Sequence, residues 1–250
     1  MTELVLVSDE GPVRIVRMNR PEKKNALTMA MYDAMADAIE SAGTTPALRC
    51  LLIAGAPTVF CAGNDIGDFL KAASAGGALG QLIPRFLYAL ARCELPLVAA
   101  VKGNAIGIGT TMLMHCDHVV ASQDARFATP FVSLGLVPEA ASSLIAPRLM
   151  GPARAFSLLV MGRPLAADEA KAAGLVNTVV APDAVEAEAM KAAAEIAALP
   201  PQAVAASRRL MRGAPDEIVA RIDAEAELFK TRLQSAEAQA AFTAFMMRKR

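Results

Sequence analysis

The chain of 250 residues carries 25 basic and 25 acidic side chains, and 54% of its residues are hydrophobic. This length and composition fit a large α/β domain with an appended region and a buried core. Balanced charge does not fit general binding to nucleic acid, which needs a concentrated basic face. No apolar run approaches the roughly 20 residues of a membrane span, and residues 1–5 are typical of neither a secretory signal nor a transit peptide. We therefore expect a cytoplasmic protein with no nucleic-acid or membrane partner.

Cysteine and histidine residues offer little material for a metal site. The four cysteines form no CxxC pair and are expected to be reduced thiols, mostly buried. His115 and His118 have a spacing that would let them share a metal on one helix face. No second group of ligands accompanies them, so we favour a helix-end or surface pair and predict no metal.

The first fifty residues alternate between strand and helix patterns. Apolar alternation predicts strands over residues 4–7 and 13–18, joined by a turn at 9–12. An amphipathic helix is predicted from about Thr28. The short apolar run at 48–54 is typical of a strand that is covered on both faces.

The alternation continues through the middle of the chain and then stops. We expect a loop at 55–64, a helix at 65–73, a flexible stretch at 74–80 and a helix at 81–93. A second round follows, with strands at 97–101 and 119–121 around a glycine-rich loop at 102–109 and a helix at 110–115. This order predicts a largely parallel sheet with right-handed crossovers.

Ala-rich helices replace the alternating pattern beyond residue 182. They are predicted at about 184–198, 201–212, 215–233 and 236–247. The chain is therefore divided into an α/β core at 1–190 and a helical region at 191–250.

Two glycine-containing loops, FCAGNDI at 60–66 and KGNAIGIG at 102–109, each connect an apolar strand to a helix. Ligands of open α/β sheets gather at such junctions, where the first N–H groups of a helix have no internal partner. Two N–H groups that converge would bind a carbonyl oxygen, and would bind it more strongly as an enolate. Ordinary tight turns are the alternative. A dinucleotide-binding fingerprint is excluded because the third glycine is absent.

A family resemblance emerges when the motifs are taken in order. The segments NRPEKKNAL, FCAGNDI, LPLVAAVKGNAIGIG, CDHVVAS, ARFATPFVSLGLVPE and LAADEAKAAGLVN together resemble the crotonase superfamily of enoyl-CoA hydratases and isomerases over nearly the whole chain. The resemblance implies a spiral of ββα units and a C-terminal helical region that builds trimers or pairs of trimers. It also implies acyl-coenzyme A thioesters as substrates, with no cofactor because coenzyme A is part of the substrate.

The same resemblance assigns roles by position. It places the oxyanion hole at the backbone N–H groups of Asn64 and Ile108. The substrate and coenzyme A site would comprise Ala62, Gly63, Asp65, Ile66, Gly107 and Phe131. Lys23 and Lys24 would approach the phosphates of coenzyme A, and a solvated charge pair is the alternative reading.

Two departures from the family pattern bear on the reaction. Hydratases of the family use two glutamates, and these positions match Thr111 and Phe131, neither of which transfers a proton as a carboxylate does. The nearest downstream acid is Glu139 in GLVPE, which resembles the Δ3,Δ2-enoyl-CoA isomerase branch, where the glutamate of the Pro-Glu pair is the acid/base. An apolar pocket would raise its pKa to a useful value. A glutamate that stabilises a helix start is the alternative, and the two roles are compatible.

The leading hypothesis is an isomerase that converts a 3-enoyl-CoA into a 2-trans-enoyl-CoA with Glu139 as its single proton shuttle. A hydratase or another crotonase-type reaction is the first alternative. An acyl-CoA binding protein that has lost catalysis is the second. The sequence leaves the acyl chain length open.

Overall fold

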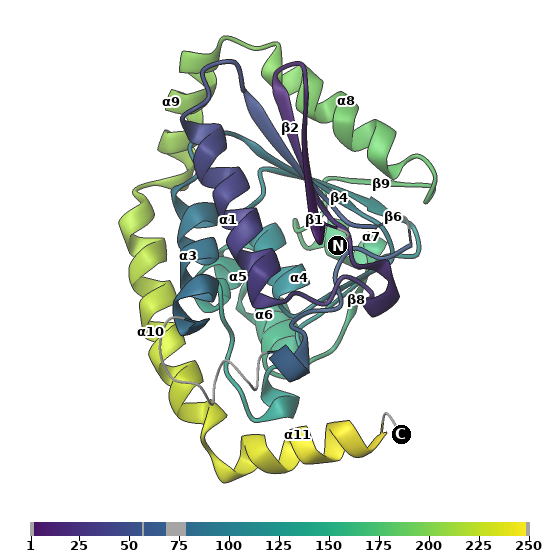
Figure 1. The fold of residues 1–250 in the computed structure, drawn as a ribbon, viewed down its shortest axis with the longest axis vertical. Helices are drawn as coiled ribbons and strands as arrows, with labels where there is room; N and C mark the ends of the chain where they lie inside the picture. The colour runs from purple at the N-terminus through teal and green to yellow at the C-terminus, as the bar shows by residue number, and fades with distance from the viewer. Residues whose placement is uncertain (1–2, 57, 69–78, 249–250) are drawn as a thin grey trace.

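The computed structural model describes residues 3–56, 58–68 and 79–248. Its centre is a six-stranded sheet in the order β1-β2-β3-β4-β6-β9 (Figure 1). The strands are β1 (Val5–Glu10), β2 (Val13–Met18), β3 (Cys50–Ala54), β4 (Leu97–Val101), β6 (His118–Ser122) and β9 (Thr178–Val180). β1 and β2 form an antiparallel hairpin, and every other neighbouring pair is parallel. The predicted largely parallel sheet is therefore confirmed.

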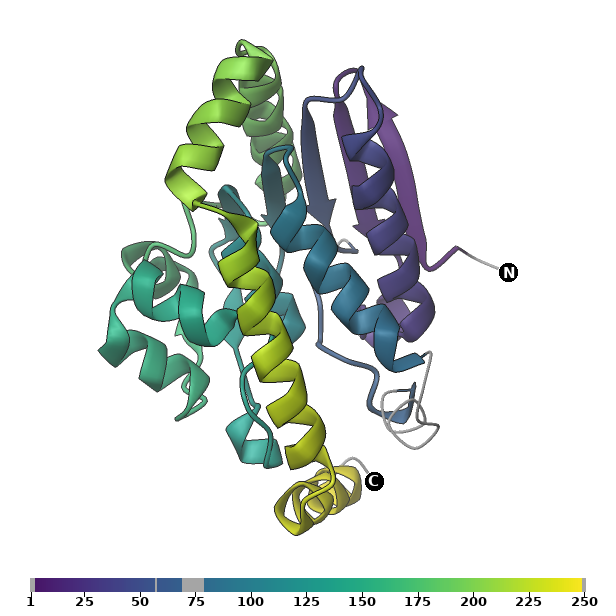
Figure 2. The ribbon, with the colours of Figure 1, turned by 90° about the vertical axis from the view of Figure 1, so that its left-hand side faces the viewer.

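Apolar side chains cover both faces of this sheet, which explains the unbroken apolar run in β3. Leu51 and Ile53 point into the larger core with helices α1 (Met29–Gly43) and α3 (Leu79–Arg92). Leu52 points the other way, into a second core with α8 (Val185–Ala197). Figure 2 shows α1 and α3 side by side. Each such buried aliphatic side chain contributes roughly 1.5–3 kcal/mol.

A second, smaller sheet was not expected from the sequence. Its strands are β5 (Asn104–Ile106), β7 (Arg126–Ala128) and β8 (Leu165–Ala166). Strands of two or three residues are too short to show a period-2 pattern, so β5 was predicted as part of a loop. The helix expected at 110–115 consists of the short α4 (Ile108–Thr111) and a 3-10 turn, η2 (Met112–His115).

The remaining helices include three that the sequence predicted, at 201–212, 215–233 and 236–247, and others that it did not. They are η1 (Pro21–Lys23), η3 (Val132–Leu134), α5 (Ser142–Met150), α6 (Pro152–Leu159), α7 (Ala167–Ala172), α9 (Pro201–Arg212), α10 (Pro215–Leu233) and α11 (Ala236–Arg248). α9 and α10 begin at the predicted prolines, because proline fits the first helical turn, where its missing N–H has no partner to lose.

The last helices return to the body of the same chain. α10 packs along α3 and α5, and α11 crosses the lower end of the molecule against η3 (Figure 1). The predicted boundary at residue 190 falls within α8, which packs on the sheet.

Two predicted segments extend beyond the described part of the chain. Residues 66–68 are helical, as expected, but residues 69–73 of the predicted helix and most of the stretch at 74–80 lie outside the described residues. Within those described residues, no helix is long and apolar enough to span a bilayer.

A substitution at Gly135 tests how closely α11 packs against the turn after η3. Its φ is 72°, and a Cβ there would lie 2.7 Å from the Ala238 backbone nitrogen and 2.8 Å from its Cα. We expect Gly135→Ala to push α11 off η3 and lower the free energy of unfolding by roughly 1–3 kcal/mol. Hydrogen exchange in α11 measures the displacement. Gly11→Ala is the matched control, because Gly11 also has a positive φ but meets nothing within 4 Å. Equal effects of the two substitutions would contradict close packing at Gly135.

Candidate active site

The two glycine-containing loops lie side by side, as their sequence positions predicted. The Cys61 N–H donates to the Asn104 carbonyl at 3.0 Å, and the Ile106 N–H donates to the Cys61 carbonyl at 2.9 Å. A Cβ on Gly63, whose φ is 88°, would lie 3.1 Å from the Ile106 carbonyl oxygen. Glycine at this position therefore allows the two backbones to meet.

Backbone N–H groups of both loops are available to a ligand. Ile108 is the first residue of α4, and Gly107 before it has a φ of 57°. In the part of the chain that the structure describes, neither the Asn64 N–H nor the Ile108 N–H has a hydrogen-bond acceptor. Such donors, fixed by backbone, stabilise an oxyanion without reorganising.

Glu139 is the buried acid of the site, with 8% of its surface exposed. Its Oε1 accepts a hydrogen bond from the Thr111 hydroxyl at 2.8 Å. Burial raises the pKa of Glu139 to about 7, the Thr111 hydrogen bond opposes this shift, and the charge of Glu225 adds to it. The carboxyl group is therefore poised to take up and release a proton near neutral pH.

The Thr111 hydroxyl connects Glu139 to the second loop. It lies 3.4 Å from the Gly107 carbonyl oxygen as well as 2.8 Å from Glu139. A hydroxyl has one proton to donate and two lone pairs to accept with. When Glu139 is ionised, Thr111 donates to it. When Glu139 is protonated, its O–H donates to Thr111, and Thr111 donates to Gly107. Both protonation states of the carboxyl group thus keep a hydrogen-bond partner.

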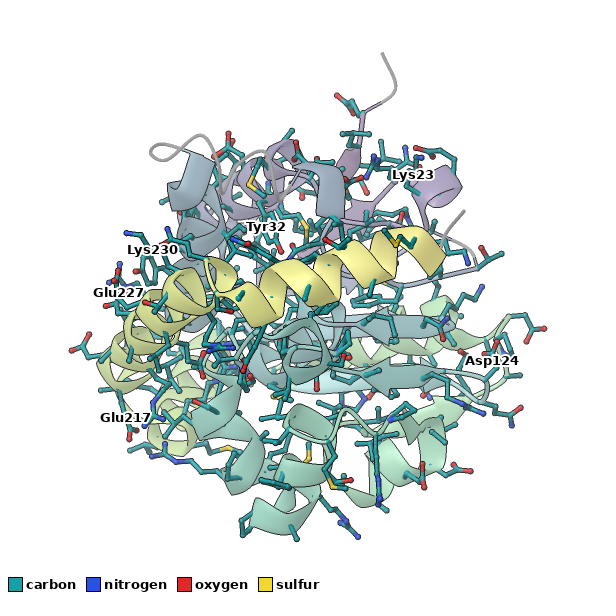
Figure 3. All side chains as sticks on the ribbon, turned by 90° about the horizontal axis from the view of Figure 1, so that it is seen from below. Lys23, Tyr32, Asp124, Glu217, Glu227 and Lys230 are labelled. Atoms are coloured by element: carbon teal, nitrogen blue, oxygen red, sulfur yellow. The ribbon has the colours of Figure 1, made fainter. Side chains whose placement is uncertain are left out.

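Tyr32 is a site residue that sequence reasoning missed. Its hydroxyl donates to Asn64 Oδ1 at 2.5 Å, and its ring packs edge-on against Phe86 with centroids 5.4 Å apart. Burial raises the pKa of Tyr32 well above its ordinary value, and Glu139 and Cys61 add to the shift, so the phenol remains a donor. Figure 3 shows Tyr32 inside the molecule, behind α11 in that view. Its only sequence signal was its place among the apolar residues of a predicted amphipathic helix.

Asn25 was also missed, although it organises the approach to the first loop. It is fully buried with a φ of 52°, a conformation that asparagine tolerates better than most residues. Its Nδ2 donates to the carbonyl oxygens of Val59 and Phe60 at 3.0 Å each, and its Oδ1 accepts from the Arg20 N–H. The polar segment near residue 20 is thereby joined to the loop that carries Asn64.

The residues assigned to coenzyme A lie around this junction. The Ala62 N–H donates to the Lys24 carbonyl at 3.0 Å, so the lysine segment borders the first loop. Lys23 and Lys24 are exposed, and Figure 3 shows Lys23 at the edge of the molecule. The Asp65 carboxylate accepts from Arg20 at 2.8 Å and from the Asp68 N–H at 3.1 Å. Asp65 thus serves the local structure, and its contact with a ligand stays a prediction.

Phe131 and Ile66 meet at the C-terminal helix. Phe131 forms a buried cluster with Leu136, Ala238 and Phe242, and Ile66 packs against this cluster. A Cβ on Gly107 would lie 3.9 Å from the Phe131 ring. The apolar side chains therefore border the second loop.

His115, which was considered as a metal ligand together with His118, is buried. Its Nε2 lies 2.8 Å from the Ala140 carbonyl oxygen.

The model of the enoyl-CoA hydratase/isomerase family matches residues 9–250. The chain is 35% identical over 250 residues to enoyl-CoA delta isomerase 2 of Rattus norvegicus, covering 98% of this chain but 64% of that protein. It is 30% identical over 249 residues to a probable enoyl-CoA hydratase of Rhizobium meliloti (strain 1021), covering 99% and 96%.

Solved structures agree with the fold expected from the sequence. An enoyl-CoA hydratase/isomerase from Pseudoalteromonas atlantica T6c superposes with a TM-score of 0.93 at 42% identity, covering 98% of both chains. The predicted crotonase-like α/β fold with its C-terminal helical region is thereby confirmed.

The pH dependence of stability tests the state of Glu139. Its folded-state pKa of about 7 lies above the ordinary 4.5, so the unfolded chain ionises first. The folded state therefore loses stability as the pH rises from about 4.5 through 7, by on the order of 3 kcal/mol in total. We expect Glu139→Gln to unfold at higher urea than wild type at about pH 8, with the difference vanishing at about pH 4.5. Glu195→Gln, at an exposed position on α8, is the control. A difference that does not vary with pH would contradict the raised pKa.

Proposed function

Because the chain belongs to the enoyl-CoA hydratase/isomerase family, we propose that it isomerises 3-enoyl-CoA thioesters to 2-trans-enoyl-CoA. The observation that supports this most directly is the buried carboxyl group of Glu139, whose side-chain hydrogen-bond partner is the Thr111 hydroxyl rather than a second carboxylate. A shift of one double bond requires one proton to leave and one to return, which one acid/base performs.

The proposed mechanism has two proton transfers. The Glu139 carboxylate removes a proton from C2 of the substrate, and the electrons form a dienolate whose charge rests on the thioester oxygen. The Asn64 and Ile108 N–H groups bind that oxygen and stabilise it more strongly than the ground-state carbonyl. The protonated Glu139 then delivers the proton to C4, and the double bond moves into conjugation with the carbonyl. Atoms and charge balance with no cofactor, since coenzyme A is part of the substrate.

Hydration has weaker support. Adding water across the conjugated bond needs a base for the water and an acid for C2, and the positions that match the two hydratase glutamates hold Thr111 and Phe131. The buried apolar cluster at Phe131 also opposes an ordered water there. Since known relatives include a delta isomerase and a probable hydratase, the assay must measure both reactions.

The decisive assay follows ultraviolet absorbance of the conjugated thioester on adding a medium-chain 3-enoyl-CoA. We expect a rise with wild type and a loss of roughly 10²–10⁴-fold in kcat for Glu139→Gln, because the amide takes up no proton. Glu195→Gln should retain the wild-type rate. Release of 3-hydroxyacyl-CoA from a 2-enoyl-CoA, lost in the same Glu139 variant, would instead support a hydratase. Binding of acyl-CoA without either reaction would support a silent binding protein.

We also propose that the chain assembles as a homotrimer or a pair of trimers through its helical region. Large apolar side chains are exposed on α6, α9 and α10, at Phe156, Leu210, Met211 and Leu228. Isolated exposed apolar residues are ordinary, but Leu210 and Met211 are adjacent and each 87% exposed.

Solution mass tests this assembly. We expect wild type to have about three or six times the mass of one chain, and Leu210→Asp with Met211→Asp to shift it toward one chain, because buried charges oppose association. Light scattering after size exclusion gives the masses. Val7→Asp, at an exposed apolar position on β1, is the control. A monomeric wild type, or an unchanged mass in the double variant, would refute the proposal.

A further inference from the structure

The turn that follows Glu139 has an unfavourable backbone. Ala140 and Ala141 both lie in the left-handed region, with φ of 61° and 54°. This conformation is unfavourable for a residue with a Cβ, and neither residue is glycine. Two such residues in succession persist only where the surroundings hold them.

A carboxylate from α10 holds one side of this turn. Glu225 is 5% exposed, and its Oε2 accepts a hydrogen bond from the Ala141 N–H at 2.6 Å. Its Oε1 accepts from the Ser143 N–H at 3.0 Å and from the Ser143 hydroxyl. Three donors to one carboxyl group favour its ionised form, which has only acceptors, and they oppose the rise in the pKa of Glu225 that its burial causes. Glu225 therefore also caps the amino end of α5 with a negative charge.

A histidine holds the other side. His115 Nε2 lies 2.8 Å from the carbonyl oxygen of Ala140, and a carbonyl only accepts, so Nε2 carries the proton. Burial lowers the pKa of His115 to about 4, so the ring is neutral. Arg212 in turn donates to the His115 carbonyl. Residues from η2 and α10, far apart in the chain, thus hold the carbonyl and the N–H of the one peptide unit that joins Ala140 to Ala141.

We propose that Glu225 is a positioning residue for the reaction: it holds the left-handed turn and so keeps the Glu139 carboxyl group against Thr111. The inference rests on the proposed function of Glu139. His115 acts from the opposite side of the turn. A local error in this turn would move the Glu139 carboxyl away from its reacting proton, and small misplacements of a catalytic group cost large factors in rate.

Glu225 also acts on Glu139 through its charge. It is one of several ionisable groups around Glu139: Tyr32 from α1, Cys61 from the first loop and Glu225 from α10 interact with it electrostatically. Arg221, also on α10, partly offsets the charge of Glu225. Tyr32 and Cys61 are neutral near pH 7, because burial raises the pKa of each. Loss of the Glu225 charge should therefore lower the pKa of Glu139.

Glu225→Gln removes the charge and places an amide donor against one of the N–H groups. We expect kcat to fall by about tenfold or more while KM changes by less than about threefold. The acidic limb of the pH–rate profile should move to lower pH. Glu227→Gln is the matched control, since Glu227 is exposed on the same helix (Figure 3). A kcat within about twofold of wild type would overturn the proposal, as would an equal loss in the control.

A second measurement does not depend on turnover. In protein labelled with ¹³C in the glutamate carboxyl groups, the Glu139 resonance is identified by its loss in Glu139→Gln, and its titration midpoint is compared between wild type and Glu225→Gln. We expect the midpoint to fall toward the ordinary glutamate value. An unchanged midpoint together with an unchanged rate refutes the positioning role. A shifted midpoint in a protein without isomerase activity would instead refute only the proposed function.

The variant is also made in an Ala141→Gly background, because glycine adopts the left-handed conformation without penalty. This background keeps the test valid if Glu225→Gln alone does not fold. We expect it to recover stability and part of kcat, since the turn needs less support, while the titration midpoint of Glu139 stays low. Recovered stability with no recovery of kcat would show that Glu225 does not act by holding the turn and would overturn the proposal.

Discussion

The burial of one carboxyl group, that of Glu139, is the constraint on which the rest of the site depends. Desolvation favours its neutral form and brings its pKa to about 7. Thr111 offers it a hydroxyl, which serves either protonation state, where a fixed N–H donor would have favoured only the anion. The same burial lowers stability as the carboxyl ionises, so the fold must hold this group against an opposing free energy. The hydrogen bonds of the following turn provide that support.

Backbone N–H groups, rather than side chains, form the candidate oxyanion hole. Glycines at positions 63 and 107 have a positive φ, and the one at 63 lets the first loop approach the Ile106 carbonyl oxygen, so the two loops that carry the candidate N–H groups lie against each other. Side chains hold the first of the two loops in place. Tyr32 holds the side chain of Asn64, and Asn25 holds the carbonyl oxygens that precede the same loop. An arrangement built on peptide groups keeps its position during a reaction, since it has few rotatable bonds.

The C-terminal helices take part in the site as well as in the predicted assembly. Glu225 on α10 contacts the turn after Glu139, and Phe242 on α11 packs against Phe131 beside the second loop. Contacts of this kind within one chain link the helical region to the α/β core.

The family resemblance in the sequence identified Glu139 as the candidate acid. The sequence by itself also determined the first five strands of the larger sheet, the starts of α9 and α10 and the two glycine loops. These features depend on local chemistry: apolar periodicity, proline at a helix start and glycine at a strand–helix junction. The roles of Asn64 and Ile108 stay predictions. Only the tertiary structure decided which partners meet, such as Thr111 with Glu139, Tyr32 with Asn64 and Glu225 with Ala141. It also decided the short second sheet. Each of these pairs joins residues 28 or more positions apart, and no local pattern records distances that arise only when the core packs.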